Sequence, residues 1–259
     1  MRSLLSDRSG SHLMQKLIDS ATNASFDAVV RQHFLGSLLE LSRDLVANFC
    51  VQSVLQRFRP HAAAAAIDGT EASASVAVEE HALLNDCFDE LRDSIGALFE
   101  AKRGTVVFRL VEACGRLGQR LKDCISAVAR GVGVNNASEN RTMVERLLVQ
   151  LQSEHSIRRL NLTAAATAAA ASAGTDGAEA VSKDVVPLTT SYPATLSVPG
   201  SQIVQCFLRS YPSNLCRVVH ESVAAIAPEL LLRMARDAAG APIESSCSVF
   251  RVCSLVLVM

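Results

Sequence analysis

Tryptophan is absent from this chain of 259 residues, and aromatic side chains make up only 4% of it. Little of the sequence alternates between apolar and polar residues, so a β-sandwich or a β-barrel is not expected. An excess of charge is also lacking, because the formal net charge is −1. This argues against a protein that binds mainly by neutralising phosphates, but it leaves stacking and base-edge contacts open. The composition favours helices packed through Leu, Val, Ala and Ile.

Motifs for catalysis are lacking as well. There is no phosphate-binding loop of the Gly-x-x-x-x-Gly-Lys type, no nucleophile elbow, and no pairing of His with Cys or of two carboxylates. The sequence therefore predicts neither an enzyme nor a cofactor. The eight cysteines include no Cys-x-x-Cys, so we expect buried reduced thiols and no metal site. The apolar run at 249–259 contains Arg251 and is too short to span a bilayer, so no membrane contact is expected.

What the sequence does contain is one short pattern that returns along the chain. It is clearest at 44–55 (DLVANFCVQSVL), and it recurs at 7–18 (DRSGSHLMQKLI) and at 198–208 (VPGSQIVQCFL). Weaker copies stand at 103–111 (RGTVVFRLV) and 237–245 (DAAGAPIES). Gln15 and Gln52 are 37 positions apart (52 − 15). A recurrence of this kind indicates a repeat architecture.

Each copy predicts a helix with one apolar stripe and one polar face. In the first copy, Gly10 forms a turn, Ser11 lies at or near the N-cap, and Gln15 follows Ser11 on the outward face. The residues expected to face the core are Leu13, Met14, Leu17 and Ile18. In the second copy, Asn48, Phe49 and Gln52 point outward, and the core residues are Cys50, Val51, Val54 and Leu55. Taken alone, such polar residues are also typical of N-caps and solvated surface.

A polar pair that flanks a flat side chain can hydrogen-bond the edge of an unpaired base and stack on it. One base per helical repeat is how Pumilio-type repeats bind single-stranded RNA. The chain resembles that family over residues 4–244, apart from the insertions given below. It is most similar to the nucleolar branch typified by nucleolar protein nine, through the segment KRGTVVFRLVEACGRLG at 102–118 and through the order of 200–205 followed by 230–240.

The resemblance implies an all-α, curved solenoid without catalytic residues. It also implies binding of a small-subunit ribosomal RNA precursor in the nucleolus or nucleus, among pre-ribosomal proteins. The implied base-edge pairs are Ser11 with Gln15, Asn48 with Gln52, Thr105 with Arg109, and Ser201 with Gln205. The implied stacking residues are His12, Phe49, Val106 and Gln202. In the last copy, Ala241, Pro242 and Ser245 depart from the pattern, so no base reading is expected there.

Low-complexity segments divide the predicted array. Repeats are expected at 1–60, 79–162 and 187–259, with an exposed insertion at 61–78 and a disordered one at 163–186. The predicted helices are 26–36 with Ser25 as N-cap, 38–45 running into 48–58, 79–100, 105–117, 122–131, 140–151, 202–211, 215–227 and 229–238. Because Met1 and Met259 both fall inside repeats, we expect a fragment of a longer array or a truncated gene model.

Two other functions remain open from the sequence. The first is a helical-repeat scaffold that binds proteins, as armadillo and HEAT arrays do. Val106 and Gln202 are poor stacking residues, and this favours the scaffold, as does the nearly neutral charge. The second is a cytoplasmic Pumilio-type regulator of messenger RNA. The 102–118 segment and the two insertions favour the nucleolar branch over this second alternative.

Overall fold

The computed structural model describes residues 2–59, 71–149 and 197–226. The insertion predicted at 163–186, the helix predicted at 229–238 and the last copy at 237–245 lie outside these ranges. Within the described ranges every regular element is a helix, so the prediction of an all-α fold is confirmed. No helix in these ranges has the length and apolar character needed to cross a membrane.

Within each described range the helices follow one another along the chain with short connections. The first part contains α1 (Arg2–Leu5), α2 (Arg8–Ser20), α3 (Asn23–His33), α4 (Leu38–Arg43) and α5 (Asn48–Arg57). The middle part contains α6 (Glu71–Leu91), a 3-10 turn at Arg92–Ser94, α7 (Ile95–Glu100), α8 (Gly104–Leu117), α9 (Leu121–Gly131), a 3-10 helix at Ala137–Thr142 and α10 (Met143–Val149). The last described part contains α12 (Val198–Ser210) and α13 (Arg217–Ala224).

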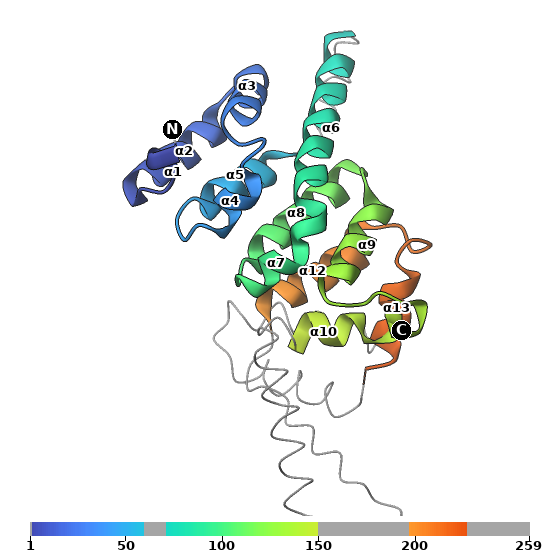
Figure 1. Ribbon diagram of the computed structural model, residues 1–259. Coiled ribbons are helices and arrows are strands. Elements are labelled where there is room, and N and C mark those ends of the chain that lie inside the picture. Colours follow the sequence, from blue (N-terminus) through green and yellow to red (C-terminus); the bar gives the residue numbers. More distant parts are fainter. Residues whose placement is uncertain (1, 60–70, 150–196, 227–259) are drawn as a thin grey trace, which may run out of the picture.

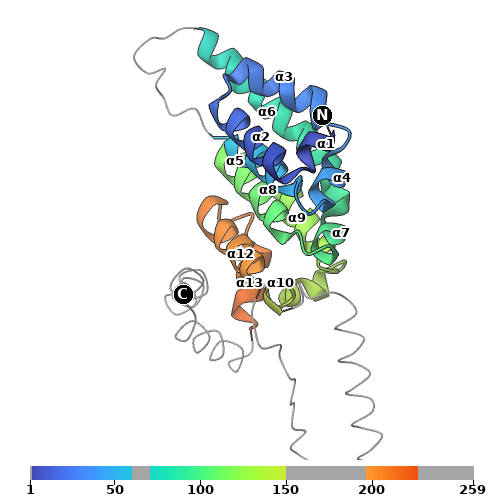
Figure 2. The same cartoon turned by 90° about the vertical axis from the view of Figure 1, so that its left-hand side faces the viewer.

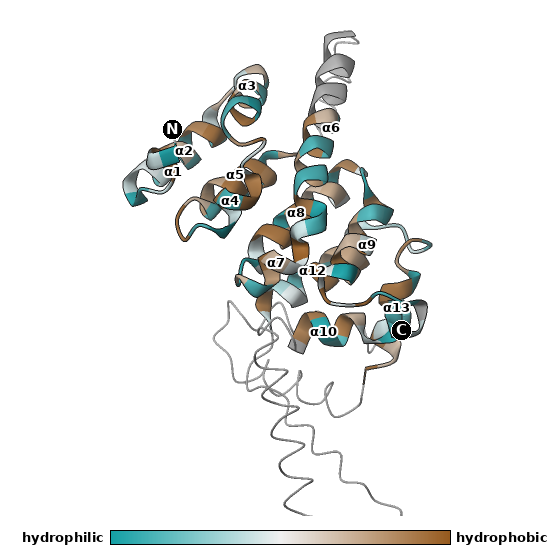
Figure 3. Ribbon diagram, in the orientation of Figure 1, coloured by the Kyte–Doolittle hydropathy of each residue, from teal (hydrophilic) through white to brown (hydrophobic). Residues whose placement is uncertain are grey.

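Four of these helices form the stacked layer: α2, α5, α8 and α12 pack side by side in this order (Figures 1 and 2). The remaining helices lie against this layer or against one another. Among them, α6 contacts α3, α4 and α8, α9 contacts α7 and α8, and α10 packs on α12 and α13. Single helices such as α8 and α9 carry both hydrophobic and hydrophilic residues, as helices with one buried face do (Figure 3). The arrangement is a solenoid in which each repeat contacts its neighbours.

A recurring cap stands directly before α2 and α12 and before the turn that leads into α5, whereas α8 has no side-chain cap. The Asp7 carboxylate accepts a hydrogen bond from the Gly10 N–H at 2.7 Å, and the Ser197 hydroxyl accepts one from the Gly200 N–H at 3.1 Å. Asp44 accepts from the N–H groups of Val46 and Ala47 at 2.7 and 2.8 Å. In each copy the cap therefore lies four residues before the first polar position, because a free N–H at a helix start needs an acceptor.

These caps correct three sequence predictions. The N-cap of α2 is Asp7 rather than Ser11, which lies inside the helix. The N-cap of α3 is Thr22, whose hydroxyl accepts from the Ser25 N–H at 3.3 Å, so Ser25 is not the cap. The predicted run from 38 to 58 is broken between α4 and α5, where Asp44 ends α4 and caps the turn that leads into α5.

Other helices agree with the prediction to differing degrees. The predicted helices 105–117 and 122–131 are confirmed as α8 and α9. However, α6 begins at Glu71, inside the segment 61–78 that was assigned to an exposed insertion. Helix growth is favourable once a nucleus exists, so the docked part of α6 extends into an alanine-rich run that has no docking stripe.

Long polar side chains tie each helix of the stacked layer to the helix before it. Arg57 of α5 donates to the carbonyls of Ile18 and Asp19 at the end of α2, at 3.0 and 2.9 Å. Arg116 of α8 donates to the Gln56 carbonyl at the end of α5, at 2.9 Å. The Tyr211 hydroxyl, just after α12, donates to the Val111 carbonyl of α8 at 2.9 Å. These are the cross-helix ties; the two arginines satisfy carbonyls that a helix end leaves open.

Candidate nucleic-acid interface

The three clearest copies place their polar residues in equivalent positions of the stacked layer. We number each reading set from its first base-edge residue, so that the stacking residue is second and the glutamine is fifth. The first positions are Ser11 in α2, Asn48 in α5 and Ser201 in α12. These residues are only 2%, 4% and 0% exposed, so the expectation that they point outward is wrong. In α2 and α12 the helix starts about one turn earlier than expected, so the first position lies within the helix, whereas Asn48 is the first residue of α5 and follows the turn that Asp44 caps.

The buried first positions make hydrogen bonds inside the protein. The Ser11 hydroxyl donates to the Arg8 carbonyl at 2.9 Å. The Asn48 amide donates to the carbonyls of Asp44 and Leu45 at 2.8 and 2.9 Å, and its oxygen accepts from the Gln52 amide at 2.8 Å.

The same pairing of first and fifth positions occurs in α12. The Gln205 amide donates to the Ser201 hydroxyl at 3.2 Å, and both residues make further contacts. In α5 and α12 the first position therefore orients the glutamine one turn further on. The fifth-position residues Gln15 and Gln52 are half-buried, whereas Gln205 is buried.

The second positions differ in what they offer to a ligand. The side chain of Phe49 is 51% exposed, which is unusual for a phenylalanine, and His12 is also exposed. Gln202 is half-buried. An exposed aromatic ring beside an oriented amide is the combination that a stacked base needs. Thus α5 provides the most complete of the predicted sets.

In α2 the predicted apolar stripe is only half correct. Met14 and Ile18 are buried, but Leu13 and Leu17 are 55% and 51% exposed. In α5 all four predicted core residues are fully buried.

The set predicted in α8 does not form as expected. Val106 is fully buried in the core, so it cannot stack on a base. Thr105 and Arg109 are half-buried, and the Arg109 guanidinium pairs with Glu112 at 2.9 Å. Arg116 reaches the same carboxylate at 2.9 Å. Sequence reasoning missed Phe108 and Glu112, which share this half-buried face of α8; the spacing of the buried residues around them is the signal that could have found them.

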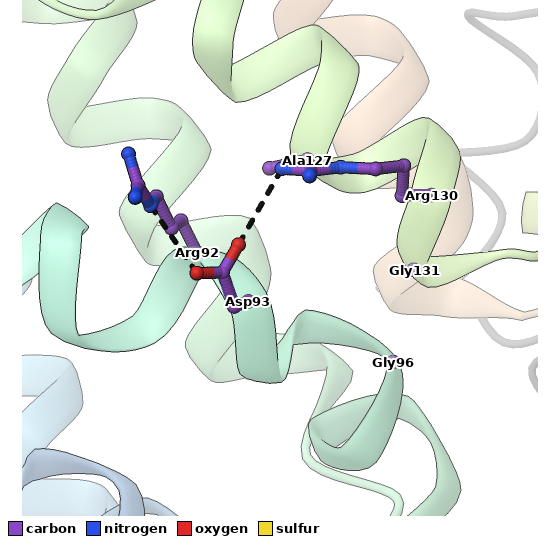
Figure 4. Close-up of a pocket in the computed structure, with 6 residues that line it drawn as sticks. All are labelled: Arg92, Asp93, Gly96, Ala127, Arg130 and Gly131. Carbon is purple, nitrogen blue, oxygen red and sulfur yellow. Dashed lines mark hydrogen bonds and ion pairs between the residues drawn. The ribbon is translucent and has the colours of Figure 1, made fainter. Parts of the chain in front are cut away.

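A separate small pocket lies between the 3-10 turn before α7 and the end of α9 (Figure 4). It encloses about 170 Å³, and Asp93 stands between Arg92 and Arg130 at 3.4 and 3.6 Å. Gly96 and Gly131 allow close contact of the two helix backbones there, since a Cβ on Gly96 would lie 3.3 Å from the Gly131 carbonyl oxygen. None of the predicted site residues lines this pocket.

Cysteines and acidic groups offer no further chemistry in the described part of the chain. The six cysteines that the structure describes are buried and free. Burial raises the pKa of Cys50 to about 11 and the pKa of Cys206 to about 12. Within 2–59, 71–149 and 197–226, no three His, Cys, Asp or Glu side chains group so as to hold a metal ion.

The fold is similar to that of solved structures of APUM23. One is APUM23 with GGAAUUGACGG, with a TM-score of 0.65 and 19% sequence identity, covering 97% of this chain and 37% of that one. Another is APUM23 with its insert region deleted and the same GGAAUUGACGG, with a TM-score of 0.64 and 18% identity, covering 97% and 38%. At this identity the likeness establishes a shared fold, and the present chain spans less than two-fifths of the length of those chains.

No curated protein matches the sequence. A family model does: the NOP9-like PUF repeat domain matches residues 1–245. That match covers all four helices of the stacked layer together with their caps and reading sets. The chain therefore belongs to the family of NOP9-like PUF repeat domains.

Proposed function

We propose that this chain binds single-stranded RNA along the stacked layer. The observation that carries the proposal is the α5 set, in which Asn48 orients the Gln52 amide at 2.8 Å beside the exposed ring of Phe49. The ring offers a stacking surface, and the free oxygen and remaining N–H of the Gln52 amide offer one acceptor and one donor for a base edge. The family match and the fold shared with the APUM23 structures support this reading.

The mode of action that suits this geometry is binding without catalysis. A segment held along the helices is covered, so a nuclease or a folding partner cannot reach it. We propose that the RNA is a small-subunit ribosomal precursor and that the site of action is the nucleolus, in the company of pre-ribosomal proteins. The support for this assignment is the match to the NOP9-like branch.

One observation favours a protein-binding role at a single helix. Leu13 and Leu17 lie one turn apart on α2, and both are more than half exposed. Two such side chains on one face suit contact with an apolar partner surface. A protein partner on α2 is compatible with RNA on α5, because the exposed leucines are not reading residues.

The test is a fluorescence-anisotropy titration of labelled GGAAUUGACGG against the 259-residue chain. The variants are Phe49→Ala and Gln52→Ala, and Gln32→Ala on the exposed surface of α3 is the matched control. We expect each reading-set variant to weaken binding by about 1–3 kcal/mol, because each removes a contact with one base. The control binds as the wild type does.

Circular dichroism of each variant establishes that it is folded. If the folded wild-type chain binds neither this RNA nor a pool of random single strands, the proposed function is wrong. If it binds and the two variants match the control, RNA does not lie on α5.

A further inference from the structure

The exposed and buried positions of α5 and α8 match when residues 56 apart are paired. The repeated sequence pattern pairs residues 57 apart instead. From 48 to 56 in α5 the exposed or half-buried positions are Phe49, Gln52, Ser53 and Gln56, and from 104 to 112 in α8 they are Thr105, Phe108, Arg109 and Glu112. Each pair is 56 residues apart, for example 105 − 49 and 108 − 52. The fully buried residues of these two spans agree with this offset: they are Cys50, Val51, Val54 and Leu55 in α5, and Val106, Val107, Leu110 and Val111 in α8. The sequence copies instead pair Asn48 with Thr105, which is an offset of 57 (105 − 48).

The starts of the two helices agree with the offset of 56, because α5 begins at Asn48 and α8 at Gly104 (104 − 48). Only residues 101–103 separate α7 from α8, and Lys102 among them has φ +60°. Arg103 provides no side-chain cap for α8. A shift of one residue rotates the side chains by about 100° around the helix axis.

The shift gives Gly104 the first position of the α8 set. A Cβ at Gly104 would lie 2.9 Å from the Cβ of Pro199 at the start of α12, so a larger residue is excluded there. Thr105 then takes the stacking position and Phe108 the fifth position, where the other helices carry glutamine. Neither Gly104 nor Phe108 has a side chain that can hydrogen-bond a base edge.

We propose that α8 contacts one nucleotide of the RNA through the Phe108 ring and the Arg109 guanidinium, and that it does so without discriminating between bases. The proposal rests on the proposed function, because it specifies how one helix of the same surface meets the RNA. Contact with an aromatic ring tolerates any base, since every base has an apolar face.

Arg109 is placed to complete this contact. Its guanidinium carbon lies 5.2 Å from the centre of the Phe108 ring, and Glu112 holds its Nη1 at 2.9 Å. The Arg109 Nε is buried and has no hydrogen-bond partner in the part of the chain that the structure describes. An unpaired buried donor is unfavourable. The nucleotide contacts the accessible part of the Arg109 side chain, which is 27% exposed, and not the buried Nε.

The experiment uses the full chain and a set of labelled GGAAUUGACGG strands in which each nucleotide in turn is replaced by the other bases or by an abasic unit. The variants are Phe108→Leu, which keeps an apolar side chain but removes the ring, and Phe108→Tyr, which keeps the ring. Their thermal midpoints establish that both are folded. A double variant, Thr105→Ala with Arg109→Ala, tests the reading set that the sequence alignment implies.

We expect one nucleotide at which all four bases bind within about threefold and the abasic unit binds about 5- to 50-fold more weakly. Phe108→Leu removes this difference between base and abasic unit at that nucleotide, and Phe108→Tyr retains it. The proposal is overturned if Phe108→Leu binds every strand as the wild type does. It is also overturned if the double variant changes which base is preferred at one nucleotide.

The Gln52→Ala variant separates this inference from the proposed function. If Gln52→Ala weakens binding and Phe108→Leu does not, the inference fails and the proposed function stands. If the folded wild-type chain binds no strand, both fail together.

Discussion

At the residue scale, Asn48 has a structural role that its spacing from Gln52 does not reveal. Its amide is buried and makes three hydrogen bonds within the protein, one of which orients Gln52. Because Gln52 is already oriented, less side-chain freedom is lost when a base binds. Next to it, Cys50 packs between α5 and α2, where its thiol donates to the Ser11 carbonyl at 3.5 Å.

The buried Cys50 thiol makes the free energy of unfolding depend on pH in the alkaline range. Burial raises its pKa from 9.0 to about 11, so the unfolded chain loses this proton first. The stabilisation is therefore complete below about pH 9 and falls as the pH rises toward 11. Urea titrations at about pH 8 and pH 10.5 compare wild type with Cys50→Ala. We expect the difference in the free energy of unfolding between wild type and Cys50→Ala to be smaller at about pH 10.5 than at about pH 8, by about 1–2 kcal/mol. A constant difference contradicts this account.

At the element scale, a side-chain cap precedes the start of α2 and of α12 and the turn before α5, whereas α8 begins without one. Asp44 shows this most fully, because its carboxylate binds the N–H groups of Val46 and Ala47 and accepts a bond from the Ser6 hydroxyl at 3.3 Å. The pKa of Asp44 is lowered by the hydrogen bonds from Ala47 and Val46. A carboxyl with a lowered pKa adds stability above its unfolded pKa, and that stability is lost as the pH falls.

Substitution of Asp44 tests how much its hydrogen bonds to the turn before α5 contribute to the free energy of unfolding. We expect Asp44→Ala to lower the free energy of unfolding by about 1–2 kcal/mol at neutral pH, and Asp44→Asn to lose less, because an amide oxygen accepts the same bonds. Urea denaturation followed by circular dichroism measures both. As the pH falls below about 4, the difference between wild type and Asp44→Asn closes, since the carboxyl becomes protonated. Equal losses for the two variants would show that Asp44 does not act as a cap.

The helices were predictable from the sequence where an apolar stripe was continuous, as in α8 and α9. Their starts were not, because Ser11 and Asn48 have the composition of caps while Asp7 and Asp44 supply the actual acceptors. Recurrence placed Ser11, Asn48 and Ser201 at equivalent positions of α2, α5 and α12, but it did not reveal that these side chains are buried. In α8 the recurrence was misleading by one residue, because the pattern of buried residues matches Gly104, and not Thr105, to Asn48.

At the scale of the whole molecule, most arginines near the stacked layer already have partners. Arg57 and Arg116 bind backbone carbonyls, and Arg109 and Arg116 share Glu112. Burial is the main reason that the pKa of Arg116 is lowered. These three arginines are therefore engaged within the protein, which together with the net charge of −1 limits the positive charge that the layer offers to phosphates.

This distribution of charge predicts a weak dependence of RNA binding on salt. For single strands the slope of log K against log salt concentration is about −0.7 for each phosphate neutralised, so two or three contacts give a slope of about −2. Anisotropy titrations of GGAAUUGACGG between about 50 and 300 mM KCl measure it. A slope steeper than about −4 would show that binding depends mainly on phosphates.

The direction of the cross-helix ties bears on how the protein is made. Arg57 reaches back from α5 to α2, Arg116 from α8 to α5, and Tyr211 from α12 to α8. In these three cases the donor side chain lies in the later helix or directly after it, and the accepting carbonyl lies in the earlier helix. During synthesis the N-terminal part emerges first. Each new repeat can therefore pack on an earlier repeat that has already folded and donate its hydrogen bonds to it. The chain is thus suited to assemble in the order of translation, one repeat at a time.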